Sequence, residues 1–87
     1  MNINQPNNKP VTQLQRVIDI ATRGSFTLTE IQRQIRKEFG LHDQETSISA
    51  RIREATQCGY RKTRQAFKNE KTGRVHYRYQ LTKRADL

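Results

Sequence analysis

The sequence predicts a single α+β domain in which three short helices are followed by a β-hairpin. Up to about residue 57, apolar residues recur at helical spacing in three successive segments. From residue 60 onward the spacing changes to the alternation of strands. The chain has 87 residues, which allows one compact core. We expect a flexible N-terminal arm over residues 1–9, the domain over residues 10–82 and a tail over residues 83–87.

The first helix is expected to begin near Pro10, because proline is tolerated in a first helical turn. The pattern of its apolar stripe ends before Gly24. The stripe consists of Leu14, Val17, Ile18 and Ala21. Residues 1–9 are rich in Asn and Gln and have little apolar surface to bury, so nothing offsets the entropy lost on ordering them.

The second helix is expected to begin after Thr27. Thr27 and Glu30 have the spacing of a capping box, in which each side chain accepts a hydrogen bond from the other residue's backbone. Gly40 stands where a left-handed residue ends many helices. The apolar stripe between them is Leu28, Ile31, Ile35 and Phe39.

The third helix is expected over residues 44–57, after a turn at residues 41–43. Ile48, Ile52 and Ala55 define its inner stripe, and Gly59 ends it. Two helices joined by so short a turn form a helix-turn-helix, in which the second helix enters the major groove of DNA.

A β-hairpin is expected after the third helix. Val75, Tyr77, Tyr79 and Leu81 share one face of a strand, and His76, Arg78 and Gln80 share the other. Residues 62–67 are the expected partner strand, and residues 69–73 supply the turn. We expect the first face to pack under the helices. The tyrosines, Tyr60 included, are then core residues rather than platforms for stacking on bases. Three helices followed by a basic hairpin is the order of a winged helix-turn-helix.

Positive charge is concentrated in the hairpin. The chain has 17 Lys and Arg against eight Asp and Glu, a formal net charge of +9. Residues 1–60 contribute +2 and residues 61–87 contribute +7. Such an excess attracts nucleic acid or anionic membranes. No apolar run approaches the roughly 20 residues of a membrane span, and the N-terminus lacks the pattern of a signal peptide. We therefore expect a soluble protein in a reducing compartment, with the lone Cys58 as a packing residue.

Three motifs resemble a family of small phage and prophage winged helix-turn-helix proteins. They are residues 49–54 (SARIRE), residues 58–60 (CGY) and residues 73–81 (GRVHYRYQL), within a similarity that spans residues 12–81. The chain departs from the family pattern at Ala55, where a leucine is usual. The resemblance implies a DNA-binding role in phage gene control, in the cytoplasm of a bacterial host cell.

The outward side of the third helix supplies the first group of candidate DNA contacts. Arg and Gln can bond to guanine and adenine edges, Ser and Thr can contact bases or phosphates, and a small alanine permits close approach. The candidates are Thr46, Ser47, Ser49, Ala50, Arg51, Arg53 and Gln57. An ordinary solvated face is the alternative. Arg51 lies nearer the apolar stripe and either reaches phosphate or pairs with Glu38 or Glu54.

The hairpin, or wing, supplies the second group of candidates. Its cations have Glu70 as the only acid between them, so they are expected to contact phosphate or the minor groove. They are Arg61, Lys62, Arg64, Lys68, Lys71, Arg74 and Arg78. Arg33 and Lys37 lie on the outward face of the second helix, where solubilising charge is at least as good an interpretation.

Nothing in the sequence indicates an enzyme. The two histidines are far apart, and no nucleophile with an adjacent base, phosphate loop or metal-ligand cluster is present. We expect double-stranded DNA as the partner, without cofactor, metal, membrane or small-molecule substrate. A homodimer or a partner protein stays open. The alternative function is a protein-interaction module on the same scaffold, and RNA binding is a third option.

Overall fold

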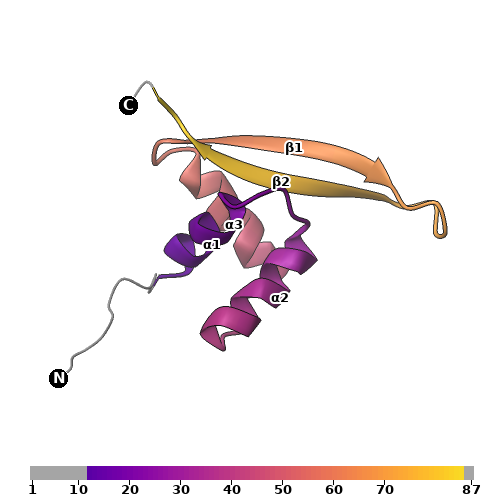
Figure 1. Cartoon of the computed structure of the whole chain (residues 1–87), viewed down its shortest axis with the longest axis horizontal. Helices are drawn as coiled ribbons and strands as arrows, with labels where there is room; N and C mark the ends of the chain where they lie inside the picture. Colours follow the sequence, from indigo (N-terminus) through magenta and orange to yellow (C-terminus); the bar gives the residue numbers. More distant parts are fainter. Residues whose placement is uncertain (1–11, 86–87) are drawn as a thin grey trace.

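The computed structural model describes residues 12–85 and confirms the predicted α+β fold, in the layout of a winged helix-turn-helix (Figure 1). The predicted arm lies outside the described residues. The helices lie against one side of the hairpin, whose far end projects past them. The elements are α1 (Gln13–Ala21), α2 (Leu28–Phe39), α3 (Glu45–Ala55), β1 (Tyr60–Lys68) and β2 (Val75–Lys83).

Local capping residues fix the helix ends. A capping box of Thr12 and Gln15 starts α1, and the predicted box of Thr27 and Glu30 starts α2. In the second box the Thr27 amide donates to Glu30 at 2.9 Å, and the Glu30 amide donates to the Thr27 hydroxyl at 3.1 Å. Gly40 ends α2 with a φ of 69°, which glycine adopts without steric strain. The predicted end of the third helix was two residues too late, since α3 ends at Ala55 and a turn follows.

The core consists of apolar side chains from all three helices and from one position of the hairpin. The inner stripe of α3 is buried as predicted, with Ile48 and Ala55 at 0% and Ile52 at 2% exposure. Leu81 is the one hairpin side chain that the structure buries in this cluster. The cluster comprises Val17, Ile20, Ala21, Ile31, Ile35, Ile48, Ile52, Ala55 and Leu81.

The hairpin is a two-stranded antiparallel sheet that pairs Tyr60 with Lys83 at one end and Lys68 with Val75 at the other. Both strands are longer than predicted. Phe26, in the connection between α1 and α2, forms an isolated β-bridge with Tyr79 on the other side of β2. Its amide donates to the Tyr79 carbonyl at 3.0 Å, and the Tyr79 amide donates back at 2.8 Å. This pair of bonds attaches the hairpin to the helical part of the domain.

The prediction that one face of β2 packs under the helices holds only for its inner half. Leu81 is buried and Tyr79 packs against the core. Tyr77 and Val75, however, are 41% and 54% exposed. Their prediction as core residues was wrong because the hairpin continues beyond the helices that could cover them (Figure 1).

The prediction of Cys58 as a packing residue was also wrong. It is exposed, because it lies in the turn that follows α3.

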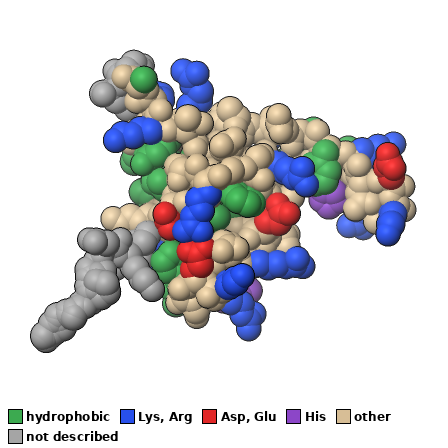
Figure 2. Space-filling model, in the orientation of Figure 1, with side chains coloured by type: hydrophobic (Ala, Val, Ile, Leu, Met, Phe, Trp, Pro, Cys, Tyr) green, Lys and Arg blue, Asp and Glu red, His purple; other side chains and the backbone are tan. Residues whose placement is uncertain are grey.

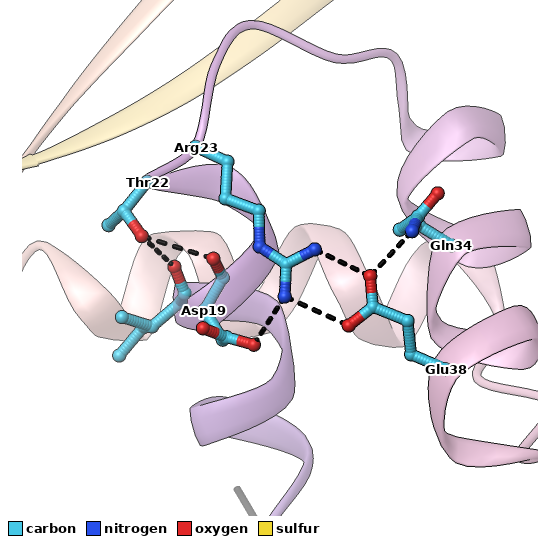
Figure 3. A network of polar contacts seen from close by, with 6 residues as sticks. Asp19, Thr22, Arg23, Gln34 and Glu38 are labelled. Atoms are coloured by element: carbon cyan, nitrogen blue, oxygen red, sulfur yellow. Dashed lines mark hydrogen bonds and ion pairs between the residues drawn. The ribbon is translucent and has the colours of Figure 1, made fainter. Parts of the chain in front are cut away.

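Polar contacts also hold α1 against α2 (Figure 3). Arg23, just after α1, donates to Asp19 and to Glu38 of α2, both at 2.8 Å. Gln34 donates to the same Glu38 carboxylate. The hydrogen bonds from Arg23 and Gln34 stabilise the ionised carboxylate and lower the pKa of Glu38 to about 2.

Candidate nucleic-acid interface

The outward side of α3 carries polar and small side chains, as its helical phase predicted. Thr46 and Arg53 are exposed, directly across the helix from the buried stripe. Gln57 is exposed too, but it lies in the turn after the helix. Ser47 and Ser49 are half-buried on the flanks, and Ala50, on the outward side, is half-buried as well. The first group of candidates is therefore divided between a solvent-facing row and its edges.

Arg51 pairs with Glu54, one of the partners that the sequence left open. Its guanidinium lies 3.3 Å from the carboxylate of Glu54, one turn along α3. Glu38, the other partner considered, binds Arg23 instead. The Arg51 side chain is 37% exposed and that of Glu54 43%, so solvent weakens their attraction. A phosphate could compete with Glu54 for this guanidinium.

A buried ion pair fixes the start of α3, and sequence reasoning missed it. Arg16 of α1 donates through Nε and Nη2 to the two carboxylate oxygens of Asp43, each at 3.0 Å. Gln32 of α2 donates to the Asp43 carbonyl at 3.1 Å. Thr29 of α2 donates to Glu45, the first residue of α3, at 2.7 Å. Both preceding helices thus hold the residues that begin α3.

The charge of Asp43 depends on this environment. Burial opposes ionisation of its carboxyl group. The hydrogen bonds from Arg16 and Gln13, together with the Arg16 charge, outweigh burial, so the pKa of Asp43 lies below its ordinary value. The only sign of the Arg16–Asp43 ion pair in the sequence is Arg16 itself, an arginine next to the apolar stripe of α1.

The register of the hairpin places its cations in two rows and a tip. Lys62, Arg64 and Lys68 share the face of Leu81 and Tyr79, which we call the inner face. Arg61 and Arg78 lie on the opposite, outer face. Lys71 and Arg74 lie at the tip, between the strands. The sequence grouped all seven, but strand geometry prevents one flat surface from contacting both rows.

The wing cations have no acidic partner among residues 12–85. Figure 2 shows Lys and Arg side chains gathered around the far end of the hairpin, with one acidic group among them. On the inner face, the Arg64 guanidinium lies over the Tyr77 ring, 4.6 Å from its centroid. Because no carboxylate in residues 12–85 pairs with the wing cations, their charge is available to a polyanion.

The outer face carries an aromatic pair that the sequence did not single out. The rings of Phe67 and His76 stack with centroids 5.6 Å apart. The Arg78 guanidinium lies over Phe67 at 4.5 Å. The register explains the contact, because Phe67 and His76 are directly opposite each other and Arg78 is their diagonal neighbour. Arg78 is therefore partly engaged within the hairpin.

No helix in residues 12–85 is long and apolar enough to cross a membrane. The same residues contain no group of His, Cys, Asp and Glu side chains that could hold a metal ion. No protein-family model, curated protein or solved structure matches the chain. The resemblance to phage winged helix-turn-helix proteins remains a prediction.

Proposed function

We propose that this protein binds double-stranded DNA in a sequence-specific manner and regulates transcription in a phage or prophage, in the cytoplasm of the bacterial host. One observation carries the proposal. The exposed polar side of α3, centred on Thr46 and Arg53, belongs to a helix that packs against a strand of the strongly basic hairpin. A helix that reads base edges beside a hairpin that binds phosphates is the arrangement that duplex recognition requires.

In the proposed complex, α3 lies in the major groove and Arg53 bonds to base edges. Its guanidinium is exposed, so it can make a bidentate contact with guanine. The buried Arg16–Asp43 pair sets the position of α3 relative to α1. The wing cations neutralise phosphates beside the groove and add affinity that depends little on sequence. No catalytic step, cofactor or small-molecule substrate is part of this function.

The proposal is tested by selecting bound duplexes from a random pool at two salt concentrations. We expect a common motif to emerge. Affinity for it should fall by orders of magnitude between roughly 50 and 200 mM salt, as counterion release predicts. Arg53→Ala should reduce the preference for the motif over a scrambled duplex by about 1–3 kcal/mol. Arg74→Ala should weaken both duplexes alike. Failure to select any motif, with equal binding to scrambled duplexes, would contradict the proposal.

A protein-interaction module is the second candidate function, and one observation favours it. Val75 and Tyr77 expose apolar surface on the part of the hairpin that extends past the helices. A partner protein could cover these side chains. Val75→Ser should then abolish capture of the partner while duplex affinity stays unchanged. Loss of duplex affinity in Val75→Ser would instead place this residue at the DNA.

A further inference from the structure

One edge of the hairpin has no backbone partner among the described residues. At Tyr79, β2 has the Phe26 bridge on one side and β1 on the other. On its far side, β1 pairs with no described strand over its nine residues. An unpaired edge leaves N–H and C=O groups free to bind a ligand or another chain.

The bonds at Tyr79 determine which residues of β1 expose these groups. The Tyr79 amide and carbonyl both bind Phe26, so they point away from β1. Arg64, which stands opposite Tyr79, therefore turns its own amide and carbonyl outward. In an antiparallel ladder this direction alternates, so Tyr60, Lys62, Ala66 and Lys68 also point outward. The hydrogen bond from the Asn69 amide to the Arg74 carbonyl, in the ladder direction, agrees with this alternation.

The residues with outward amides are also the ones with inner-face side chains. Three of the five are cations, namely Lys62, Arg64 and Lys68. Each combines an N–H donor at the edge with a positive side chain next to it. Arg61 lies on the outer face, and its amide points into the ladder. Of the wing cations in the strands, only those on the inner face therefore place a side-chain donor and a backbone N–H donor where the same anion can bind both.

The free edge belongs to the strand that follows α3 in the chain and contacts it. Of the three helices, α3 is the one that packs mainly against β1, whereas α1 and α2 pack against β2. The Arg64 guanidinium is held over the Tyr77 ring, which limits the freedom it would lose on binding.

We propose that the free edge of β1 is the phosphate-binding strip of the wing. The DNA backbone beside the α3 contact binds Lys62, Arg64 and Lys68 together with the outward amides of the strip, that of Ala66 included. Arg61 and Arg78, on the outer face, stay off the DNA. This inference rests on the proposed function and adds which face of the wing the duplex occupies.

Two variants with the same loss of charge test the strip. Lys62→Ala/Arg64→Ala removes two cations from the inner row, and Arg61→Ala/Arg78→Ala removes two from the outer face. Duplex affinity is measured at several salt concentrations, with melting curves as a check on folding. The inner variant should bind at least tenfold more weakly than the outer variant. Its plot of log affinity against log salt should lose about 1.8 from its slope, at about 0.9 per phosphate contact.

A third variant tests the amides without changing charge. Ala66→Pro removes one outward N–H, at an edge position where proline does not break the ladder. It should reduce affinity by about tenfold or more, the value of a hydrogen bond to a charged group. Gln65→Gly is the control for a change in backbone flexibility. It alters the flexibility of β1 but keeps every N–H of the strand.

The outcomes separate this inference from the proposed function. Equal losses in the two double variants would mean that only net charge matters, and a larger loss in the outer variant would put the DNA on the other face. Either result overturns the strip and leaves duplex binding intact. Wild-type affinity in Ala66→Pro would overturn the role of the amides. If the wild-type protein binds no duplex at all, the proposed function itself fails.

Discussion

Removing one member of the buried Arg16–Asp43 pair should destabilise the domain more than any surface change. The two side chains are 10% and 9% exposed, and two hydrogen bonds of 3.0 Å join them. Asp43→Ala leaves the Arg16 guanidinium buried without its carboxylate, which costs about 3–5 kcal/mol. The whole stability of a small domain lies in the range of about 5–15 kcal/mol. At about 4 °C per kcal/mol or more, Tm should fall by at least 12 °C.

The double variant Arg16→Met/Asp43→Leu separates the pair from simple loss of packing. Apolar residues of similar volume often replace a buried ion pair at little cost, so the double variant should be more stable than Arg16→Met or Asp43→Leu alone. Urea denaturation followed by the helical circular dichroism signal compares the wild type, these two single variants and the double variant. The reasoning is refuted if the single variants lie within about 1 kcal/mol of the wild type, or if their losses add in the double variant.

Three further predictions test the helices. Ile52→Ala should lower the free energy of unfolding by about 2–5 kcal/mol in urea titrations, whereas Gln57→Ala should leave Tm within a few degrees. The reverse result would show that the phase of α3 is wrong. Because the pKa of Glu38 is lowered to about 2 from 4.5, its contribution to stability is complete above pH 4.5 and lost as the pH falls toward 2. Glu38→Gln should flatten that part of the pH profile, and an unchanged profile would argue against the Arg23 contact. Gly40→Ala should cost about 1–2 kcal/mol, because alanine is strained at a φ of 69°, and Gly40→Asn should cost less. Equal stability of the two variants, measured by thermal melting, would contradict this cause.

Local patterns in the sequence were sufficient to predict the order and kind of the elements. The capping box at Thr27 and the left-handed Gly40 depend on residues no more than a few positions apart, so α2 could be placed to its last residue. The phase of α3 followed from Ile48 and Ile52 in the same way. Periodicity identifies a face, but it does not say where a neighbouring element stops. Tyr77 has the alternation of a core residue and still lies in solvent.

The candidate site was harder to predict, because its geometry depends on contacts between distant residues. Arg16 and Asp43 are 27 positions apart, and no local rule joins them. The wing cations were found from charge alone, but their division into two rows required the register of β1 with β2. That register depends on the turn at residues 69–74 and on the bridge from Tyr79 to Phe26. The choice between Glu38 and Glu54 as the partner of Arg51 likewise needed the relative positions of α2 and α3.

The double hydrogen bond between Phe26 and Tyr79 divides the hairpin into two parts with different freedom to evolve. On the helical side of the bridge, Leu81 is buried in the core and its replacement would affect folding. Beyond the bridge, residues 65–78 lie outside the core cluster and are mostly exposed. Mutations and insertions there should be tolerated by the fold, provided that they come in pairs that keep the alternation of faces. The length of the wing, and with it the width of DNA that one molecule could cover, can therefore change from one descendant to the next without a change in the core.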